Sequence, residues 1–163
     1  MKEAIQTLLK SDKMAHAFEY LKQDEAHTID QQIELVQISS FSPFEEKRAI
    51  RFKELLTEAG LDPVMDEVHN VYAHIHGTGN GPTLYVSAHL DTVFPPETPL
   101  PVKREGTKIY APGIGDDTRG LAEILTLARA IKESGLKPVG DIIIGGNVGE
   151  EGLGDLRGMR HFF

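Results

Sequence analysis

The fold of this chain depends on residues 141–148, which read DIIIGGNV. Three consecutive isoleucines in a short apolar run are typical of a strand that is buried on both faces of a parallel sheet. Residues 118–134 carry apolar side chains at spacings of three and four and stop at Gly135, which predicts an amphipathic helix. A buried strand that alternates with helices indicates an α/β fold, and we expect α/β/α layers around a mostly parallel central sheet.

Other strand signals lie upstream of this run. Residues 70–76 alternate in polarity and residues 83–88 are apolar, so the glycine-rich loop 77–82 between them predicts a hairpin. A second small hairpin is expected from residues 102–105 and 108–110, which flank a Gly-Thr turn. The glycine-rich loop 77–82 leads into a strand rather than a helix, which excludes the usual phosphate-binding glycine motifs.

The first 60 residues read as helical, with apolar positions recurring at spacings of three and four. Ser42-Pro43-Phe44-Glu45 has the pattern of a capping box with proline at the first helical position. This pattern predicts a helix from about Pro43 to a stop at Gly60.

Composition limits the kinds of partner. The net charge of −8 should repel nucleic acid and anionic lipid, so we expect neither as a partner. No window approaches the ~18 apolar residues of a membrane span, and the N-terminus lacks the apolar core of a signal peptide, so a cytoplasmic location is expected. Because the chain has no cysteine, a metal site would need His, Asp and Glu ligands.

The first candidate turn follows the strand from Thr83, at the edge where α/β sheets bind ligands. His89 and Asp91 are two residues apart, so they point the same way in extended chain. Asp91 could then hold the imidazole in one tautomer while the other ring nitrogen meets a metal. The alternative is an ordinary His-Asp pair in a solvated loop.

The second candidate turn contains Asp116 and Asp117 between glycines and a helix start. Acids at this position are ordinarily helix caps. A carboxylate in such a turn could instead bridge two cations, since flanking glycines allow close backbone approach.

The third turn is Gly149-Glu150-Glu151-Gly152, directly after the buried strand. Adjacent side chains diverge, so one Glu could bind a metal while the other takes a proton from water, as metal-assisted hydrolysis requires. A solvated acidic turn is the alternative.

His74 and His76 could form a surface metal pair, although the polar outward face of a strand also explains them.

Taken together, the three turns resemble the M20 family of metallopeptidases and deacylases, which includes peptidase T-like, carboxypeptidase G2-like and acetylornithine deacetylase-like enzymes. The resemblance rests on residues 87–92, 113–117 and 150–152, which occur in family order. It implies the zinc-dependent exopeptidase fold, a three-layer α/β/α sandwich, and a cis peptide bond between Asp116 and Asp117.

The resemblance also implies site roles. His89 corresponds to a ligand of one metal, Asp116 to the carboxylate bridging both, and Glu151 to a ligand of the second. Glu150 corresponds to the general base and Asp91 to the residue that orients His89. Two zinc ions are expected in the full-length enzyme, with cobalt or manganese as other candidates.

By the same resemblance, residues 1–28 are an N-terminal helical extension and residues 29–163 the first half of a catalytic domain. The dimerisation domain and the C-terminal half would be absent, so we expect an inactive fragment of a homodimeric enzyme. The expected reaction is hydrolysis of an amide bond in a small peptide, as in an aminopeptidase or tripeptidase. The alternatives are an N-acyl amino acid deacylase and a non-catalytic metal-binding or interaction fragment.

Overall fold

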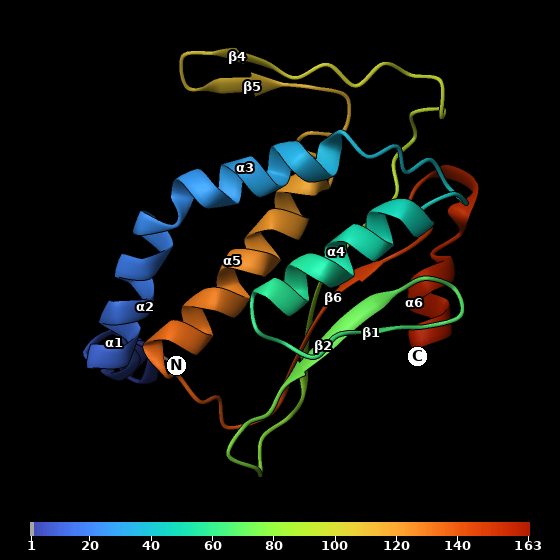
Figure 1. Ribbon diagram of the computed structural model, residues 1–163. Helices are drawn as coiled ribbons and strands as arrows, with labels where there is room; N and C mark the ends of the chain where they lie inside the picture. The colour runs from blue at the N-terminus through green and yellow to red at the C-terminus, as the bar shows by residue number, and fades with distance from the viewer. Residues whose placement is uncertain (1) are drawn as a thin grey trace.

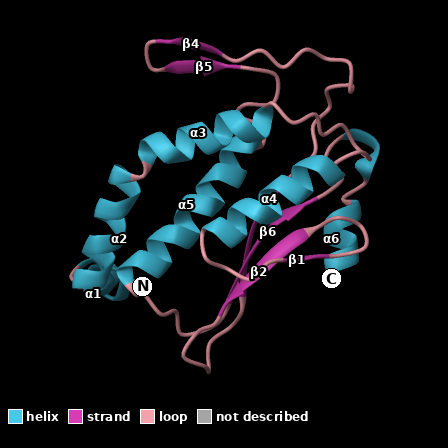
Figure 2. Cartoon of the chain, viewed as in Figure 1, coloured by secondary structure: helices cyan, strands magenta, loops and turns pink. Residues whose placement is uncertain are grey.

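The computed structural model describes residues 2–163 (Figures 1 and 2). The helices are α1 (Lys2–Leu9), α2 (Asp12–Gln23), α3 (Glu25–Val36), α4 (Glu46–Glu58), α5 (Thr118–Ser134), the short 3-10 helix η1 (Gly152–Gly154) and α6 (Arg157–Phe162). The strands are β1 (Val64–Met65), β2 (Val71–Ile75), β3 (Leu84–His89), β4 (Lys103–Glu105), β5 (Lys108–Tyr110) and β6 (Ile142–Asn147).

The main sheet has the strand order β1-β2-β6-β3, with the predicted apolar strand β6 in its interior. β6 pairs in parallel with β3 and antiparallel with β2. The prediction of an α/β fold is therefore confirmed, and the described sheet is mixed, because two of its three pairings are antiparallel.

The hairpin predicted for residues 70–88 is wrong. β2 and β3 are both present, but β6 lies between them, so the glycine-rich loop 77–82 crosses the end of β6. The physical reason is the apolar run of β6. Its isoleucines are removed from water most completely in an interior strand with neighbours on both sides. The second predicted hairpin is confirmed as a separate sheet of β4 and β5 (Figure 2). In this sheet Glu105 faces Lys108.

Helices cover both faces of the main sheet. On one face, Phe52 of α4 and Leu121 and Leu125 of α5 are buried in the same core as Ile144 of β6. On the other face, the ring of Phe162 in α6 stacks on Tyr85 of β3, with centroids 4.4 Å apart. The three-layer α/β/α arrangement is thus present in the described chain, with α2 and α3 lying outside α5 (Figure 1).

Helix α4 begins at Glu46, three residues later than its capping pattern predicts. Glu45 is the residue before the helix, and no side-chain cap hydrogen bond forms there. The Glu45 carboxylate is instead fully buried and pairs with Arg157 of α6 at 2.9 Å. The capping box does not form because Glu45, the glutamate that it requires, pairs with Arg157 instead.

A buried polar cluster fastens the N-terminal helices to α5. Asp24, between α2 and α3, accepts hydrogen bonds from Arg129 Nε at 2.9 Å and from Thr126 Oγ1 at 2.7 Å. Burial alone would raise the pKa of Asp24, but the bonds from Thr126 and Arg129 outweigh it and lower the pKa below its ordinary value. The carboxylate is therefore a paired charge that ties α2 and α3 to the helix beneath them.

None of the described helices has the length and apolar content needed to cross a membrane.

Replacing Asp24 with alanine should lower the free energy of unfolding by about 3–5 kcal/mol, because Arg129 would remain buried without its partner. Urea denaturation of the 163-residue chain measures this change. Asp30→Ala, at an exposed position of α3, is the control and should change stability by less than about 0.5 kcal/mol. The double variant Asp24→Leu/Arg129→Met should recover most of the loss, and a double variant as unstable as Asp24→Ala would contradict the role of the ion pair.

Candidate metal centre

The candidate residues meet at one edge of the main sheet. β3 and β6 run in parallel, with His89 opposite Asn147 at their last positions. Parallel strands present their carboxyl ends at the same edge, so the loops that follow them emerge side by side. The turn before α5 reaches the same place, because the backbone amide of His89 donates to Asp117 Oδ2 at 3.2 Å.

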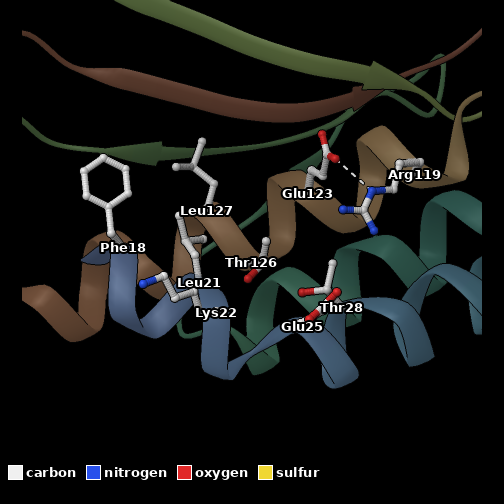
Figure 3. A pocket seen from close by; sticks show the side chains of 9 residues that line it. All are labelled: Phe18, Leu21, Lys22, Glu25, Thr28, Arg119, Glu123, Thr126 and Leu127. Atoms are coloured by element: carbon white, nitrogen blue, oxygen red, sulfur yellow. Dashed lines mark hydrogen bonds and ion pairs between the residues drawn. The ribbon is translucent and has the colours of Figure 1, made fainter. Parts of the chain in front are cut away.

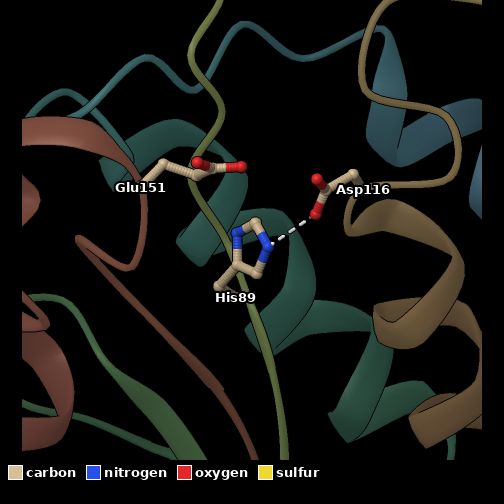
Figure 4. A group of neighbouring side chains, drawn as sticks. All are labelled: His89, Asp116 and Glu151. Carbon is tan, nitrogen blue, oxygen red and sulfur yellow. Dashed lines mark hydrogen bonds and ion pairs between the residues drawn. The ribbon is translucent and has the colours of Figure 1, made fainter.

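Three side chains from these loops point toward one another. His89, Asp116 and Glu151 each offer a ligand atom, and these atoms lie within 4.8 Å of one another. Figure 4 shows the imidazole of His89 lying between the two carboxylates, which arrive from opposite sides. One imidazole and two carboxylates form a donor set that suits zinc and related divalent ions, so the residues fit the metal that the family resemblance implies.

Asp91 is fully buried beneath this group. Its Oδ1 accepts the backbone amide of Glu150 at 3.0 Å, and its Oδ2 accepts that of Glu151 at 2.8 Å. Burial alone would raise the pKa of Asp91, but its interactions with His89 and these two amides outweigh that effect and lower the pKa. One buried carboxylate therefore holds the backbone of both glutamates.

His89 is oriented mainly by the backbone of Asp91. Its Nδ1 lies 3.1 Å from the Asp91 carbonyl oxygen and 3.6 Å from the carboxylate, so the carbonyl accepts the Nδ1 proton. Its Nε2 lies 2.9 Å from Asp116 Oδ1. Burial on its own lowers the pKa of His89, but the carboxylates of Asp91 and Asp116 outweigh it and raise the pKa to about 9. Without metal, the imidazole is a cation that donates from both nitrogens.

The two aspartates of the second turn have different environments. Asp117 caps α5, accepting the backbone amide of Gly120 at 3.1 Å, as acids at helix starts commonly do. The Asp116 side chain is 76% exposed and faces His89. The peptide bond between them is cis, as the resemblance implies.

The two glutamates of the third turn also differ. The Glu151 carboxylate belongs to the donor group, and burial together with the charge of Asp116 raises its pKa. Glu150 is exposed and contributes its backbone amide to Asp91, but its carboxylate is not among the converging donors that the described residues form. The structure thus brings four of the five candidate residues into direct contact or convergence and places the fifth beside them.

Two hollows flank Glu151. One, of about 520 Å³, is bounded by Phe41, Thr92 and Leu153, and the other, of about 290 Å³, by Phe94 and Ile114. A larger hollow of about 930 Å³ lies between α2, α3 and α5 (Figure 3). It contains none of the three converging donors, so the smaller hollows are the ones that could receive a substrate.

Sequence reasoning missed several residues that hold the site. Asn70 is buried; its Oδ1 accepts the amide of Val148 at 3.1 Å, and its Nδ2 donates to the carbonyl of Gly158 at 2.9 Å. Arg48 is buried and donates to the carbonyl of Leu90 at 2.9 Å, and burial lowers its pKa to about 10. A charged residue within the apolar stripe of α4 could have marked Arg48, whereas nothing local marks Asn70.

Residues 85–163 match the model of peptidase family M20/M25/M40. Carboxypeptidase G2 of a Pseudomonas species is 38% identical over 84 residues, which cover 50% of this chain and 20% of that protein.

Two solved structures share both the fold and part of the sequence. A tripeptidase from Staphylococcus aureus is 31% identical with a TM-score of 0.63, covering 77% of this chain and 37% of that one. The aminopeptidase PepT from Bacillus cereus is 26% identical with a TM-score of 0.64, covering 76% and 36%. The chain thus spans between a fifth and about two fifths of the length of these three relatives.

Zinc binding should release about one proton, because His89 must lose its Nε2 proton before it can act as a ligand. Below the pKa of about 9, the apparent zinc affinity should therefore rise about tenfold per pH unit between pH 6 and 8. Calorimetric titration of the metal-free chain carrying His74→Ala and His76→Ala, in buffers of different ionisation enthalpy, measures the proton count at this group alone. A binding heat that does not depend on the buffer would contradict the charged state of His89.

The variant Asp91→Asn should bind zinc about 10–100-fold more weakly. Its side-chain NH₂ group would replace one carboxylate oxygen and would face the backbone N–H of Glu150 or Glu151, so that hydrogen bond would be lost. The Glu150-Glu151 backbone would then shift away from His89. Titration with zinc in the same His74→Ala/His76→Ala background measures the change, with Asp62→Asn on an exposed loop as the control. Unchanged zinc affinity in Asp91→Asn would show that Asp91 does not position the donors.

Proposed function

We propose, on the premise that this chain belongs to peptidase family M20/M25/M40, that the protein carrying it uses two metal ions to hydrolyse an amide bond in a small peptide. The observation that carries the proposal is the convergence of His89, Asp116 and Glu151 at one sheet edge, with Glu150 beside them. The similarity to a tripeptidase and to PepT supports a short peptide as the substrate.

We assign His89 to one ion, Glu151 to the second and Asp116 to both. The support for a bridging role is the position of Asp116, which faces His89 at 2.9 Å from a glycine-rich turn and is otherwise exposed. Zinc fits this donor set, and cobalt or manganese would fit it as well. When bound, such ions polarise the scissile carbonyl and lower the pKa of a water molecule toward ~7.

Glu150 is the proposed general base. Its exposed side chain leaves the same turn as Glu151 but, as the adjacent residue, diverges from it. It would take the proton of the attacking water and deliver it to the leaving amine. Asp91 is a positioning residue, because it touches the backbone of both glutamates and the ring of His89 rather than a reacting atom.

The hollows beside Glu151 are consistent with a small substrate. Their walls include Phe41, Val93, Phe94 and Leu153, which can pack against the side chain of a bound peptide. Assay of the active protein against di- and tripeptides, with N-acyl amino acids in parallel, tests the substrate class. Turnover of N-acyl amino acids without peptide cleavage would favour a deacylase instead.

The two glutamates should respond differently to the same substitution. Glu150→Gln should keep the zinc content of the protein and lower kcat by about 10²–10⁴, whereas Glu151→Gln should lose zinc. Zinc content by elemental analysis and kcat on a cleaved tripeptide measure the two effects. Glu97→Gln, on an exposed loop, is the matched control. Equal zinc loss in Glu150→Gln and Glu151→Gln would overturn the division of roles.

A further inference from the structure

Two histidines and an aspartate lie together at the other end of β6. His74 belongs to β2 and His76 follows its last residue. The two rings stack with centroids 6.0 Å apart and an interplanar angle of 29°. Both imidazoles therefore project from the same face of the strand, as residues two apart in extended chain do.

A carboxylate from a distant part of the chain joins this pair. Ile75 of β2 lies opposite Ile142 of β6, so one step further His76 lies opposite Asp141. Asp141 Oδ2 is 3.6 Å from His76 Nδ1, while Asp141 Oδ1 accepts the backbone amide of Gly77 at 2.8 Å. The amide of Gly77, and then the neighbouring His76 and His74, lower the pKa of Asp141, so the carboxylate is ionised at neutral pH.

We propose that His74, His76 and Asp141 bind a divalent transition-metal ion such as Zn²⁺ or Ni²⁺. Two imidazoles and one carboxylate are a known set of protein ligands for zinc, in which water takes the remaining position. Imidazole nitrogen favours zinc, nickel and copper, whereas magnesium and calcium favour oxygen ligands. The net charge of −8 adds a general attraction for cations.

The side chains can reorient to converge on an ion. His76 is 81% exposed and Asp141 is 39% exposed, so little restrains the imidazole of His76 beyond its stack on His74. The Gly77 amide already fixes one carboxylate oxygen of Asp141 and leaves the other directed toward His76. Ordering the two exposed rings costs conformational entropy, which makes this site weaker than a pre-ordered one.

This site is independent of the candidate metal centre and of the proposed function. Asp141 precedes the first residue of β6, whereas Asn147, opposite His89, is the last. The two groups are thus separated by about 20 Å of strand, at ~3.3 Å per residue. An ion at the second site would fasten the end of β2 to the start of β6.

Zinc and nickel titration of the 163-residue chain tests the proposal. The chain would carry His89→Ala and Glu151→Ala, which remove two donors of the candidate metal centre. We expect this background to bind one equivalent of either ion, and no Mg²⁺. Adding His74→Ala or His76→Ala should weaken binding at least tenfold. Asp141→Asn, which keeps an oxygen for the Gly77 amide, should weaken it by a smaller factor.

The matched control is His27→Ala. His27 is an exposed histidine whose Nδ1 lies 3.2 Å from Asp24 Oδ1, so it resembles His76 and Asp141 but lacks a stacked second imidazole. It should leave the affinity unchanged. Circular dichroism confirms that each variant is folded before titration. The proposal is overturned if the background binds neither ion, or if His27→Ala weakens binding as much as His74→Ala does.

Discussion

The parallel pairing of β3 and β6 is the constraint on which the candidate metal centre depends. It sets Leu84 opposite Ile142 and His89 opposite Asn147, so two loops that are far apart in the sequence leave the sheet at the same edge. In this register the backbone of β6 packs closely against its neighbours, and glycine at two positions of the strand permits that contact. A side chain at Gly146 would come within about 3.1 Å of both Leu90 and Phe52, and one at Gly145 would meet the carbonyl oxygen of Val71 at 2.7 Å. Gly145 and Gly146 therefore leave the space that β6 needs in the interior of the sheet.

Buried polar groups fix the positions of the turns that meet at the sheet edge. Asp91 binds the amides of Glu150 and Glu151, and Asn70 binds the residues on both sides of that turn. Arg48 binds the carbonyl of Leu90 and offsets the buried charge of Asp91. Each of these groups would be costly to bury without its partners, so the site is held by interactions that cannot be relaxed one at a time. The donors themselves stay partly exposed, where they can reach a ligand.

Both ends of β6 collect polar side chains for the same topological reason. Its carboxyl end lies beside the end of its parallel neighbour β3, which brings His89 to Glu151. Its amino end lies beside the end of its antiparallel neighbour β2, which brings His76 to Asp141. A strand between one parallel and one antiparallel partner thus receives a loop at each end.

Local pattern in the sequence determined much of this protein. The apolar face and terminal glycine of α5, the isoleucine run of β6 and the turn of the β4–β5 hairpin are encoded by neighbouring residues, and all three elements occur as predicted. The motifs around His89, Asp116 and Glu151 were visible because their acids stand out beside apolar and glycine-rich sequence.

Only the tertiary structure decided which segments became neighbours. β6 separates β2 from β3 although the chain passes directly from one to the other, because burial of its isoleucines outweighs the local preference for a hairpin. Helix α4 starts later than predicted because Glu45 pairs with Arg157. Asp91 accepts hydrogen bonds from the amides of Glu150 and Glu151, which lie in a distant turn. Such contacts depend on strand order and register, which no local pattern specifies, since their free energy arises only when the whole core has assembled.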